Sequence, residues 1–309
     1  MDSPWHLPGE WLKGALHVHT TNSDGRLTPQ EVIDTYAACG YDFVVFSDHG
    51  KVTQPSSVDG KGLVAIGGAE IGAGKSVLGS NYHLLAVGLD DLAEGEIDTT
   101  TAQRAVDGLR AKGALVFVAH PYWSLLDEVD LRAVECDGVE VFNAGCEYET
   151  QHGDSGQHWD WVTATGKRPL GVAVDDSHWG FWDGAGGWVM VRSEERSAGA
   201  ILAALKAGSF YSSTGPTIEE LDVAADRLYL RCSEVAGIRM LRPGPGMGWT
   251  NHWTCERPPC PTVVTEAEIA PPGDGAAFRM EIIDGAGRKA WTNLMSIDSA
   301  EAQPTVIVR

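Results

Sequence analysis

Short apolar runs alternate with amphipathic stretches from residue 13 to about residue 208. The apolar runs predict buried strands at Ala15–Val18, Phe43–Phe46, Leu63–Ile66, Leu84–Val87, Ala114–Ala119, Gly138–Phe142, Leu170–Val174 and Trp188–Val191. The amphipathic stretches predict helices that open after Thr28 and lie at Ala102–Lys112, Leu131–Glu135, His158–Thr165 and Ala198–Ala207. Continuous apolar strands separated by helices are typical of a parallel sheet covered on both faces. Seven or more such strands favour a closed or nearly closed barrel.

The first of these helices has a clear start and end. Thr28 can cap it, Pro29 suits its first position, and Glu31 completes a capping box. Gly40 is typical of the residue that follows a helix. The first helix is therefore expected between the first two strands.

The pattern changes near Gly215 and Pro216. Beyond them no long helix is predicted, and Pro/Gly turns separate short strands at Leu221–Val223, Arg227–Arg231, Ile238–Leu241, Phe278–Ile283, Lys289–Asn293 and Val306–Val308. We therefore expect an α/β barrel over residues 1–216. A small all-β, sandwich-like accessory domain without catalytic ligands is expected over residues 217–309.

Composition narrows the classes of partner. The chain has 309 residues, of which 43% are hydrophobic, so it can bury a sizeable core. Its 23 Lys and Arg against 43 Asp and Glu give a net charge of −20. A surface this acidic repels nucleic acid and anionic membranes, so we expect neither as a partner. A small anionic substrate stays possible, because bound cations can reverse the local field. The oligomeric state is not predicted.

The chain shows no address outside the cytoplasm. No run approaches the ~18 apolar residues of a membrane span, and residues 1–10 do not read as a signal peptide. Six scattered cysteines fit reduced thiols better than a disulfide framework. The close pair Cys255 and Cys260 could alternatively form a small disulfide or a metal clip. We expect a cytoplasmic protein.

Histidines and carboxylates collect at the ends of the predicted strands. His17 and His19 form an H-x-H pair on one extended segment, where residues two apart point the same way. The other candidates are Asp24, Asp48, His49, Glu70, His120, Asp175, Asp176 and His178. Strands of α/β barrels build their sites at these ends. His83 differs, because it lies at the start of its strand and must reach the site from another angle.

Imidazoles with a few carboxylates suit Zn²⁺, Mn²⁺ or Fe²⁺. Taken singly, each histidine could be a structural residue, and Asp24, Asp48 and Asp175 could each form a turn or cap a helix. The joint pattern favours a metal site, and the surplus of ligands over one ion indicates more than one metal. The histidines without a partner in spacing are interpreted as surface or structural residues: His6, His152, His158 and His252.

These motifs, in this order, resemble the PHP (polymerase and histidinol phosphatase) family. The resemblance rests on Leu16-His17-Val18-His19-Thr20, Ser23-Asp24-Gly25, Ser47-Asp48-His49, Glu70, His83, Ala119-His120-Pro121 and Asp176-Ser177-His178. It covers roughly residues 11–216 and is closest to stand-alone metallohydrolases that include carbamate and ester hydrolases. It implies a distorted seven-stranded (β/α) barrel with two or three metals.

The resemblance also implies a set of ligands for each ion. His17, His19, Glu70 and Asp176 would hold the first metal, Glu70 would bridge to a second held by His83 and His120, and Asp24, His49 and His178 would hold a third. The family's Asp-x-His motif selects Asp176 over Asp175, which is expected to support the ligands from behind.

We expect hydrolysis of a small ester by a metal-activated hydroxide, with Glu70, Asp176, His49 and His178 as the catalytic set. Phosphoesters come first and carboxyl esters or aryl carbamates second, because Tyr122 and Trp123 follow His120-Pro121 where phosphatases of the family often carry a basic residue. His49 or His178 could instead act as a general acid if the third metal is absent. Trp159, Trp161, Trp179 and Trp182 are expected either to line an apolar pocket or to pack the barrel. A non-catalytic metal-binding or recognition module is the remaining alternative.

Overall fold

The computed structural model describes residues 3–224, 226–242, 249–253, 263–272 and 275–297. The chain divides into two compact units. The barrel unit is Pro8–Thr214, and the β unit is Gly215–Arg309 together with Met1–Leu7. The sequence placed this division after residue 216 and grouped the first seven residues with the barrel.

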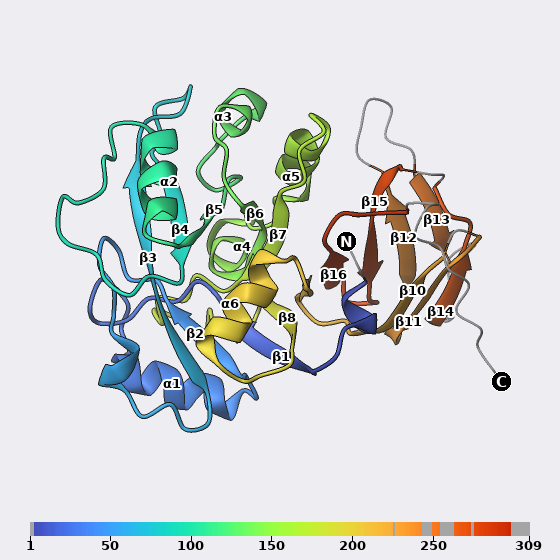
Figure 1. Ribbon diagram of the computed structural model, residues 1–309, viewed down its shortest axis with the longest axis horizontal. Helices are drawn as coiled ribbons and strands as arrows, with labels where there is room; N and C mark the ends of the chain where they lie inside the picture. Colours follow the sequence, from blue (N-terminus) through green and yellow to red (C-terminus); the bar gives the residue numbers. More distant parts are fainter. Residues whose placement is uncertain (1–2, 225, 243–248, 254–262, 273–274, 298–309) are drawn as a thin grey trace. The chain divides into compact units, whose positions relative to one another are not determined.

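The barrel unit is fully described and mixes strands with covering helices (Figure 1). Its strands are β1 (Glu10–Ala15), β2 (Phe43–Phe46), β3 (Val64–Ala73), β4 (Tyr82–Val87), β5 (Leu115–Val118), β6 (Gly138–Asn143), β7 (Leu170–Val174), β8 (Trp188–Ser193) and β9 (Phe210–Ser213). Its α-helices are α1 (Pro29–Ala38), α2 (Ala102–Ala111), α3 (Glu128–Arg132), α4 (Ala144–Thr150), α5 (Gly156–Thr163) and α6 (Ala198–Lys206), with a short 3-10 helix, η2 (Pro55–Ser57).

The strands follow the order β9-β8-β1-β2-β3-β4-β5-β6-β7. Pairs β1–β2, β2–β3, β5–β6 and β6–β7 are parallel. The expected parallel sheet is wrong at β4, which runs antiparallel to both β3 and β5, and at β8, which runs antiparallel to β1. The unpredicted β9 is antiparallel to β8. Val18 forms a parallel bridge with Ser177, so the segment after β1 meets the segment after β7 and closes the sheet. The predicted α/β barrel is confirmed.

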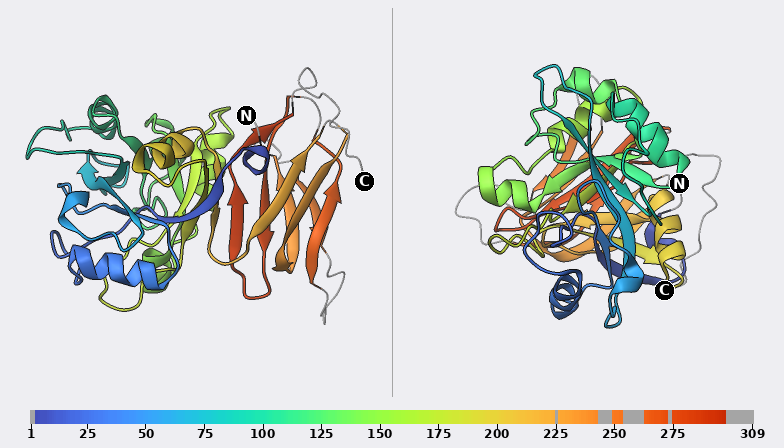
Figure 2. Two further views of the ribbon diagram at one scale, coloured as in Figure 1. Left: turned by 60° about the horizontal axis from the view of Figure 1, so that its bottom comes forward. Right: turned by 90° about the vertical axis from the view of Figure 1, so that its left-hand side faces the viewer.

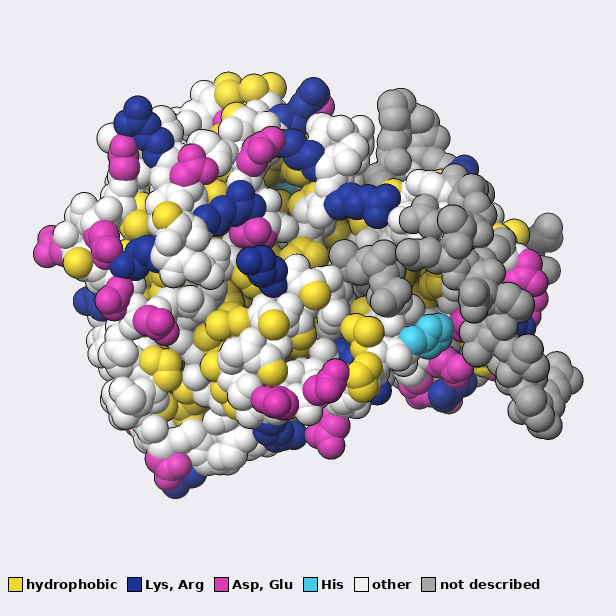
Figure 3. Space-filling view, viewed as in Figure 1, with side chains coloured by type: hydrophobic (Ala, Val, Ile, Leu, Met, Phe, Trp, Pro, Cys, Tyr) yellow, Lys and Arg dark blue, Asp and Glu magenta, His cyan; other side chains and the backbone are white. Residues whose placement is uncertain are grey.

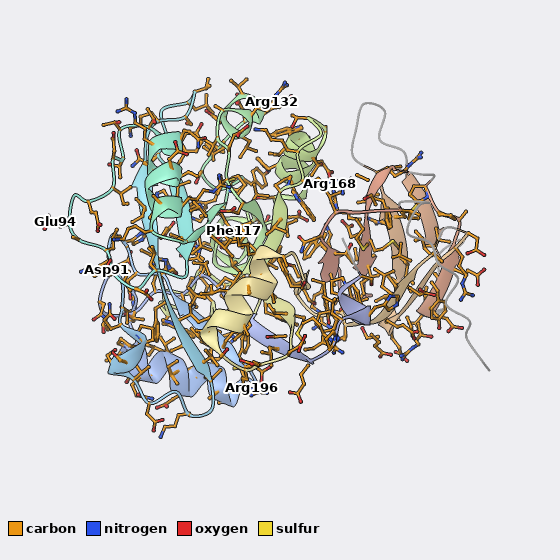
Figure 4. All side chains as sticks on the ribbon, in the orientation of Figure 1. Asp91, Glu94, Phe117, Arg132, Arg168 and Arg196 are labelled. Carbon is orange, nitrogen blue, oxygen red and sulfur yellow. The ribbon has the colours of Figure 1, made fainter. Side chains whose placement is uncertain are left out.

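Alternating side chains on each strand form the core. Phe43 and Val45 of β2 point into the barrel interior, which Ile201 and Leu205 of α6 help to fill. Phe117 lies in the middle of the unit, whereas the charged Asp91 and Glu94 lie at its edge (Figure 4). Gly14 of β1 gives the Phe43 ring its space, since a Cβ there would lie 1.9 Å from the ring.

The opposite faces of the strands carry the helices, which lie around the outside of the unit (Figures 1 and 2). Helix α1 packs Ile33 and Tyr36 against Val44 and Phe46 of β2. Its predicted capping box is present: the Thr28 hydroxyl accepts from the Glu31 amide, and the Glu31 carboxylate accepts from the Thr28 amide. Among the described residues, no helix has the length and apolar character that a membrane crossing requires.

Several predicted boundaries are wrong. β1 begins at Glu10 and ends at Ala15. Its residues 10–14 pair with β8, and the polar residues among them interrupt the apolar pattern. β3 continues to Ala73, so Glu70 lies inside the strand and not at its end. Helix α3 begins three residues early because Asp127 caps it. Helix α4 and strand β9 were not predicted.

The β unit contains two antiparallel sheets, β10-β11-β14 and β13-β12-β15-β16, with β17 paired to β15. Its strands are β10 (Ile218–Val223), β11 (Leu228–Val235), β12 (Gly237–Leu241), β13 (Trp249–Trp253), β14 (Val264–Ile269), β15 (Ala277–Ile283), β16 (Lys289–Thr292) and β17 (Met295–Ser296). β13, β14 and β17 were not predicted. The predicted strand Val306–Val308 and the Cys255–Cys260 pair lie outside the described residues.

The first residues of the chain join this unit through two hydrogen bonds. The Ser3 hydroxyl donates to the Leu221 carbonyl at 2.9 Å, and the Trp5 indole donates to the Ile218 carbonyl at 3.1 Å. The short 3-10 helix η1 (Pro4–His6) holds this segment against β10.

Candidate metal centre

All nine predicted ligands meet at one end of the barrel unit. Within three overlapping groups, the candidate ligand atoms lie within 4.8 Å of one another: His17, His19, Glu70 and Asp176; Glu70, His83 and His120; and His19, Asp24, His49 and His178. The grouping follows the one that the resemblance implies, with His19 added to the third group. Their role as ligands stays a prediction.

The direction of β4 explains how His83 reaches the site. Because β4 runs antiparallel to β3, the start of β4 lies beside the end of β3. Cα partners Gly72 and His83 face each other across this pair, two residues beyond Glu70. His83 therefore lies at the start of its strand, and not at the end, because β4 runs in the opposite direction to β3.

The first group has the dimensions of a metal cage. The distances from His17 Nε2 to His19 Nε2, Glu70 Oε2 and Asp176 Oδ1 are 3.1, 3.2 and 3.2 Å. His19 Nε2 lies 3.2 Å from the same Glu70 oxygen and 3.1 Å from the same Asp176 oxygen. A tetrahedral ion with bonds of about 2.0 Å needs ligand atoms about 3.3 Å apart. The four side chains therefore fit a small divalent ion.

One atom of this group supports the same conclusion. Asp176 Oδ1 is buried and makes no hydrogen bond, although buried polar atoms are nearly always paired. It points at the two histidine Nε2 atoms, so a cation between them would satisfy it. Two imidazoles and two carboxylates are a donor set for Zn²⁺, Mn²⁺ or Fe²⁺.

The second group shares Glu70 with the first. Glu70 Oε1 lies 2.7 Å from His83 Nδ1 and 3.0 Å from His120 Nε2, so the two oxygens of Glu70 face different groups.

The third group is wider and more exposed. Asp24 lies 3.5 Å from His49 and from His178, and 3.6 Å from His19 Nδ1. Its carboxylate is 54% exposed, against 1% for Glu70.

Charge pairing dominates the electrostatics of the buried groups. Burial lowers the pKa of His17, but Asp176, Glu140 and Glu70 together raise it well above its usual range. Burial alone would raise the pKa of Glu70. The neighbouring histidines lower it by more, so the pKa falls well below its usual range. The pKa of His19 rises to about 9 against its own desolvation, because the carboxylates of Asp176 and Glu70 lie 3.1 and 3.2 Å from its Nε2. The metal-free site is therefore a buried network of ion pairs.

A third carboxylate, Glu140 of β6, was missed by the sequence analysis. His17 Nδ1 donates to Glu140 Oε1 at 2.6 Å, and the His120 backbone amide donates to Oε2 at 2.7 Å. Asn143 Nδ2 donates to the same Oε2 at 2.9 Å and to Asp176 Oδ2 at 3.1 Å. The signal was present, since Glu140 is the one charged residue in the apolar run Gly138–Phe142.

Three further aspartates hold the loops that carry the ligands. Asp48 accepts from Thr20, Ser23 and Thr53, which fixes the turn before Asp24.

The other two act beyond β7. Asp175 accepts from the Tyr36 hydroxyl at 2.7 Å and from the backbone amides of residues 185–187, as expected of a supporting residue. Asp183 accepts from the amides of His178 and Trp179.

The backbone is strained at two candidate ligands. His120 has φ 28° and Asp176 has φ 55°, in the left-handed region that side chains other than glycine rarely adopt. The Glu140 bond to the His120 amide and the His17 carbonyl bond to the Asp176 amide, at 2.9 Å, hold these conformations. Strain of this kind collects at functional sites.

The groups open into a cavity of about 240 Å³. Beyond the candidate ligands its lining consists of Trp123, Gly145, Cys146, Glu149 and Asp183. This lining contains no Lys or Arg.

The remaining predicted histidines and tryptophans belong to none of the three ligand groups, as far as the structure describes them. Among the described residues, His6, His152 and His158 join none of the three groups, and the side chain of His252 is not described. Trp159 is fully buried and donates to the Pro169 carbonyl, so it packs the barrel. Trp161 packs against His158. Trp179 is half-buried beneath His19, whereas Trp182 is exposed.

The structure is similar to a two-domain protein containing a predicted PHP-like metal-dependent phosphoesterase from Bacteroides vulgatus ATCC 8482. The TM-score is 0.51 and the identity 15%, over 94% of this chain and 97% of that chain. At this identity the likeness shows a shared fold. It confirms the resemblance at that level.

Two more solved structures align over 53% of this chain and 87% of their own. One is a candidate metal-dependent phosphoesterase from Bifidobacterium adolescentis ATCC 15703, with a TM-score of 0.42 and 18% identity. The other is an amidohydrolase from Chromobacterium violaceum, with bound sulfate and no metal, at a TM-score of 0.39 and 16% identity. No family model and no curated protein sequence matches the chain.

Proposed function

We propose that this protein is a metal-dependent hydrolase of phosphoesters, with a centre of two or three divalent transition metals. The observation that carries the proposal is the set of three ligand groups that share Glu70 and His19. A site for one structural ion needs four ligands, and these groups offer nine. Zn²⁺, Mn²⁺ and Fe²⁺ are the candidate ions.

The residues divide into roles by their placement. His17, His19, Glu70 and Asp176 would hold the first ion, and Glu70 with His83 and His120 the second. Asp24, His49 and His178 would hold the third, which we expect to be the weakest because its ligands are widest apart and most exposed. Bound ions would supply an activated water near neutral pH and would stabilise negative charge on the substrate.

The side chains of this protein supply orientation and protons. Glu140 keeps a proton on His17 Nδ1, so that Nε2 faces the first group with its lone pair once the imidazole is neutral. His49 and His178 border the cavity and are about a third exposed. Burial lowers the pKa of His49, so it is ready to bind an ion or to pass a proton.

Charge favours a phosphoryl substrate. The ligand carboxylates of Asp24, Glu70 and Asp176 carry three negative charges. Two divalent ions would balance these charges together with that of Glu140, which contacts His17, and a third would make the centre positive. Such a centre can bind phosphoryl oxygens without a Lys or Arg clamp.

A carboxyl ester or aryl carbamate is the second candidate. Two observations favour it: the cavity lining lacks Lys and Arg, and it includes Trp123. A neutral carbonyl substrate needs less positive charge and gains from an aromatic wall.

Metal content and a substrate panel test the proposal together. Purified protein from metal-replete expression should contain about two to three equivalents of transition metal. Under one metal, the assay compares p-nitrophenyl phosphate, p-nitrophenyl acetate and an aryl carbamate. Glu70→Gln should abolish turnover, and Glu135→Gln on the exposed surface should not. One equivalent or less, or activity that survives Glu70→Gln, would refute the cluster. Turnover of carbonyl substrates alone would reverse the order of the two candidates.

A further inference from the structure

Exposed apolar side chains concentrate in the segments that follow the strands of the barrel unit. Ten large hydrophobic side chains are exposed among the described residues. Nine of them lie in the segments that follow β3, β5, β6 and β7, at the end of the barrel that carries the ligands. Hydrophobic side chains are visible along the top of the barrel unit, over α3 (Figure 3). We call six of these nine exposed residues the apolar rim: Val77, Leu78, Trp123, Leu125, Phe181 and Trp182.

Trp123 connects the rim to the cavity. It lines the cavity and is 42% exposed. Its ring meets His120 edge-on at 5.1 Å and His83 at 6.2 Å between centroids. The ring is thus fixed beside the ligands of the second group while much of it faces solvent. A residue that only packed the barrel would be buried, as Trp159 is.

The loop after β7 presents a second aromatic surface. Trp179 anchors this loop by donating to the His19 carbonyl at 3.2 Å. Asp183, which lines the cavity, binds the amides of the loop from its other end. Between these anchors the loop carries Phe181 and Trp182, and Trp182 is 62% exposed. A held loop with exposed aromatic side chains suits a ligand surface.

The charge of the cavity lining disfavours a second anionic group on the substrate within the cavity. Apart from the candidate ligands, the charged residues of the lining are Glu149 and Asp183. A remote phosphate inside the cavity would find no Lys or Arg in the lining, and the Arg26 guanidinium lies outside it, against Gly180 in the loop after β7. A neutral apolar group would find Trp123. The cavity, at about 240 Å³, is below the ~300–1,000 Å³ of drug-sized sites, so a bulky group would extend onto the rim.

We propose that the substrate is an ester whose non-reacting part is apolar, an aryl or alkyl group that lies on Trp123 and the apolar rim. This rests on the proposed function and names the substrate class of the same site. The rim then acts as a specificity surface: it favours substrates with large apolar groups over small or multiply charged ones.

The test measures binding rather than turnover. Isothermal titration calorimetry follows methyl-, butyl- and octylphosphonate binding to the full chain loaded with Co²⁺. Each methylene buried on the rim should lower Kd by about fourfold, so butylphosphonate should bind more than tenfold tighter than methylphosphonate. Trp123→Ala should reduce this ratio to less than threefold, and Trp182→Ala should flatten the step from butyl to octyl. Val263→Ala, which truncates an exposed hydrophobic residue of the β unit, should leave the ratios unchanged.

The other possible outcomes distinguish failure of the inference from failure of the proposed function. Equal affinities along the series would refute the apolar substrate and leave the metal centre standing. A loaded protein that binds no phosphonate would refute the proposed function and the inference together. A chain-length dependence that survives both tryptophan variants would remove the rim as its cause. A dimer that breaks in Trp182→Ala and blocks phosphonate binding would assign the rim to a second copy of the chain.

Discussion

Glu140→Gln tests the support of the first ligand group, because it changes charge and hydrogen bonding without changing size. Glu140 is fully buried and accepts from the His17 ring, the His120 amide and Asn143. An amide has one acceptor oxygen and one NH₂ group. Whichever way it turns, its NH₂ group faces a donor, either His17 Nδ1 or the His120 amide.

The magnitude follows from these contacts. A buried donor left without an acceptor costs about 1–3 kcal/mol. Loss of a carboxylate partner behind a ligating histidine weakens metal binding by about 10–100-fold, which is about 1.4–2.7 kcal/mol. The two ranges agree. We expect 10–100-fold weaker binding at the first group, and a thermal midpoint of the metal-free protein lower by about 2–8 °C.

Competition with a chromophoric chelator measures the affinity, and calorimetry measures the midpoint. Glu147→Gln is the matched control, because Glu147 lies near the site but bonds to the Gly153 amide. A Glu140→Gln protein that unfolds at a lower temperature yet keeps metal affinity within twofold of wild type would show that Glu140 supports the fold alone.

Four further predictions follow from the same geometry. Glu70→Gln should remove metal from two groups and His83→Ala from one, so equal and mild losses of metal and rate in both variants would show that Glu70 does not bridge. His17 and His19 have raised pKa values, about 9 for His19, and must lose protons to bind an ion, so metal affinity should rise 10–100-fold from pH 6.5 to 7.5 in chelator competition. The same pKa shifts stabilise the metal-free fold fully below the unfolded histidine pKa of about 6.5, and denaturant melts should show this stability falling as the pH rises through about 9. Asp48→Asn should weaken the third ion by about tenfold, because the turn before Asp24 loses charge-assisted bonds, and spectroscopic titration with Co²⁺ should show the first group unchanged.

The sequence predicts the ligands well because metal chemistry restricts residue type and spacing. His17 and His19 are two apart on an extended segment, and Asp176 follows an apolar strand, so local pattern identifies each. Their convergence follows from strand ends that share one edge of a sheet.

The parts that pattern missed depend on partners far away in the chain. The antiparallel direction of β4 is set by its pairing with β3 and β5, which no local period records. Glu140 lies in a strand, where its role depends on His17, 123 residues away. β1 is partly polar and becomes a strand because β8 pairs with it. Tertiary contacts decided each of these features.

The closure of the barrel has a consequence for the order in which the site assembles. Glu70 and His83 are 13 residues apart across the β3–β4 hairpin, so this pair of ligands can meet as soon as a local hairpin forms. His17 follows β1 and Asp176 follows β7, so the first group exists only when these two distant segments have met. An ion at the first group would bind the closed barrel but not a chain in which the barrel is open. By mass action it would therefore stabilise the contact, here called the seam, between the segments after β1 and β7. Metal depletion is therefore expected to raise amide hydrogen exchange first at His19 and Asp176, whose backbone amides cross that seam.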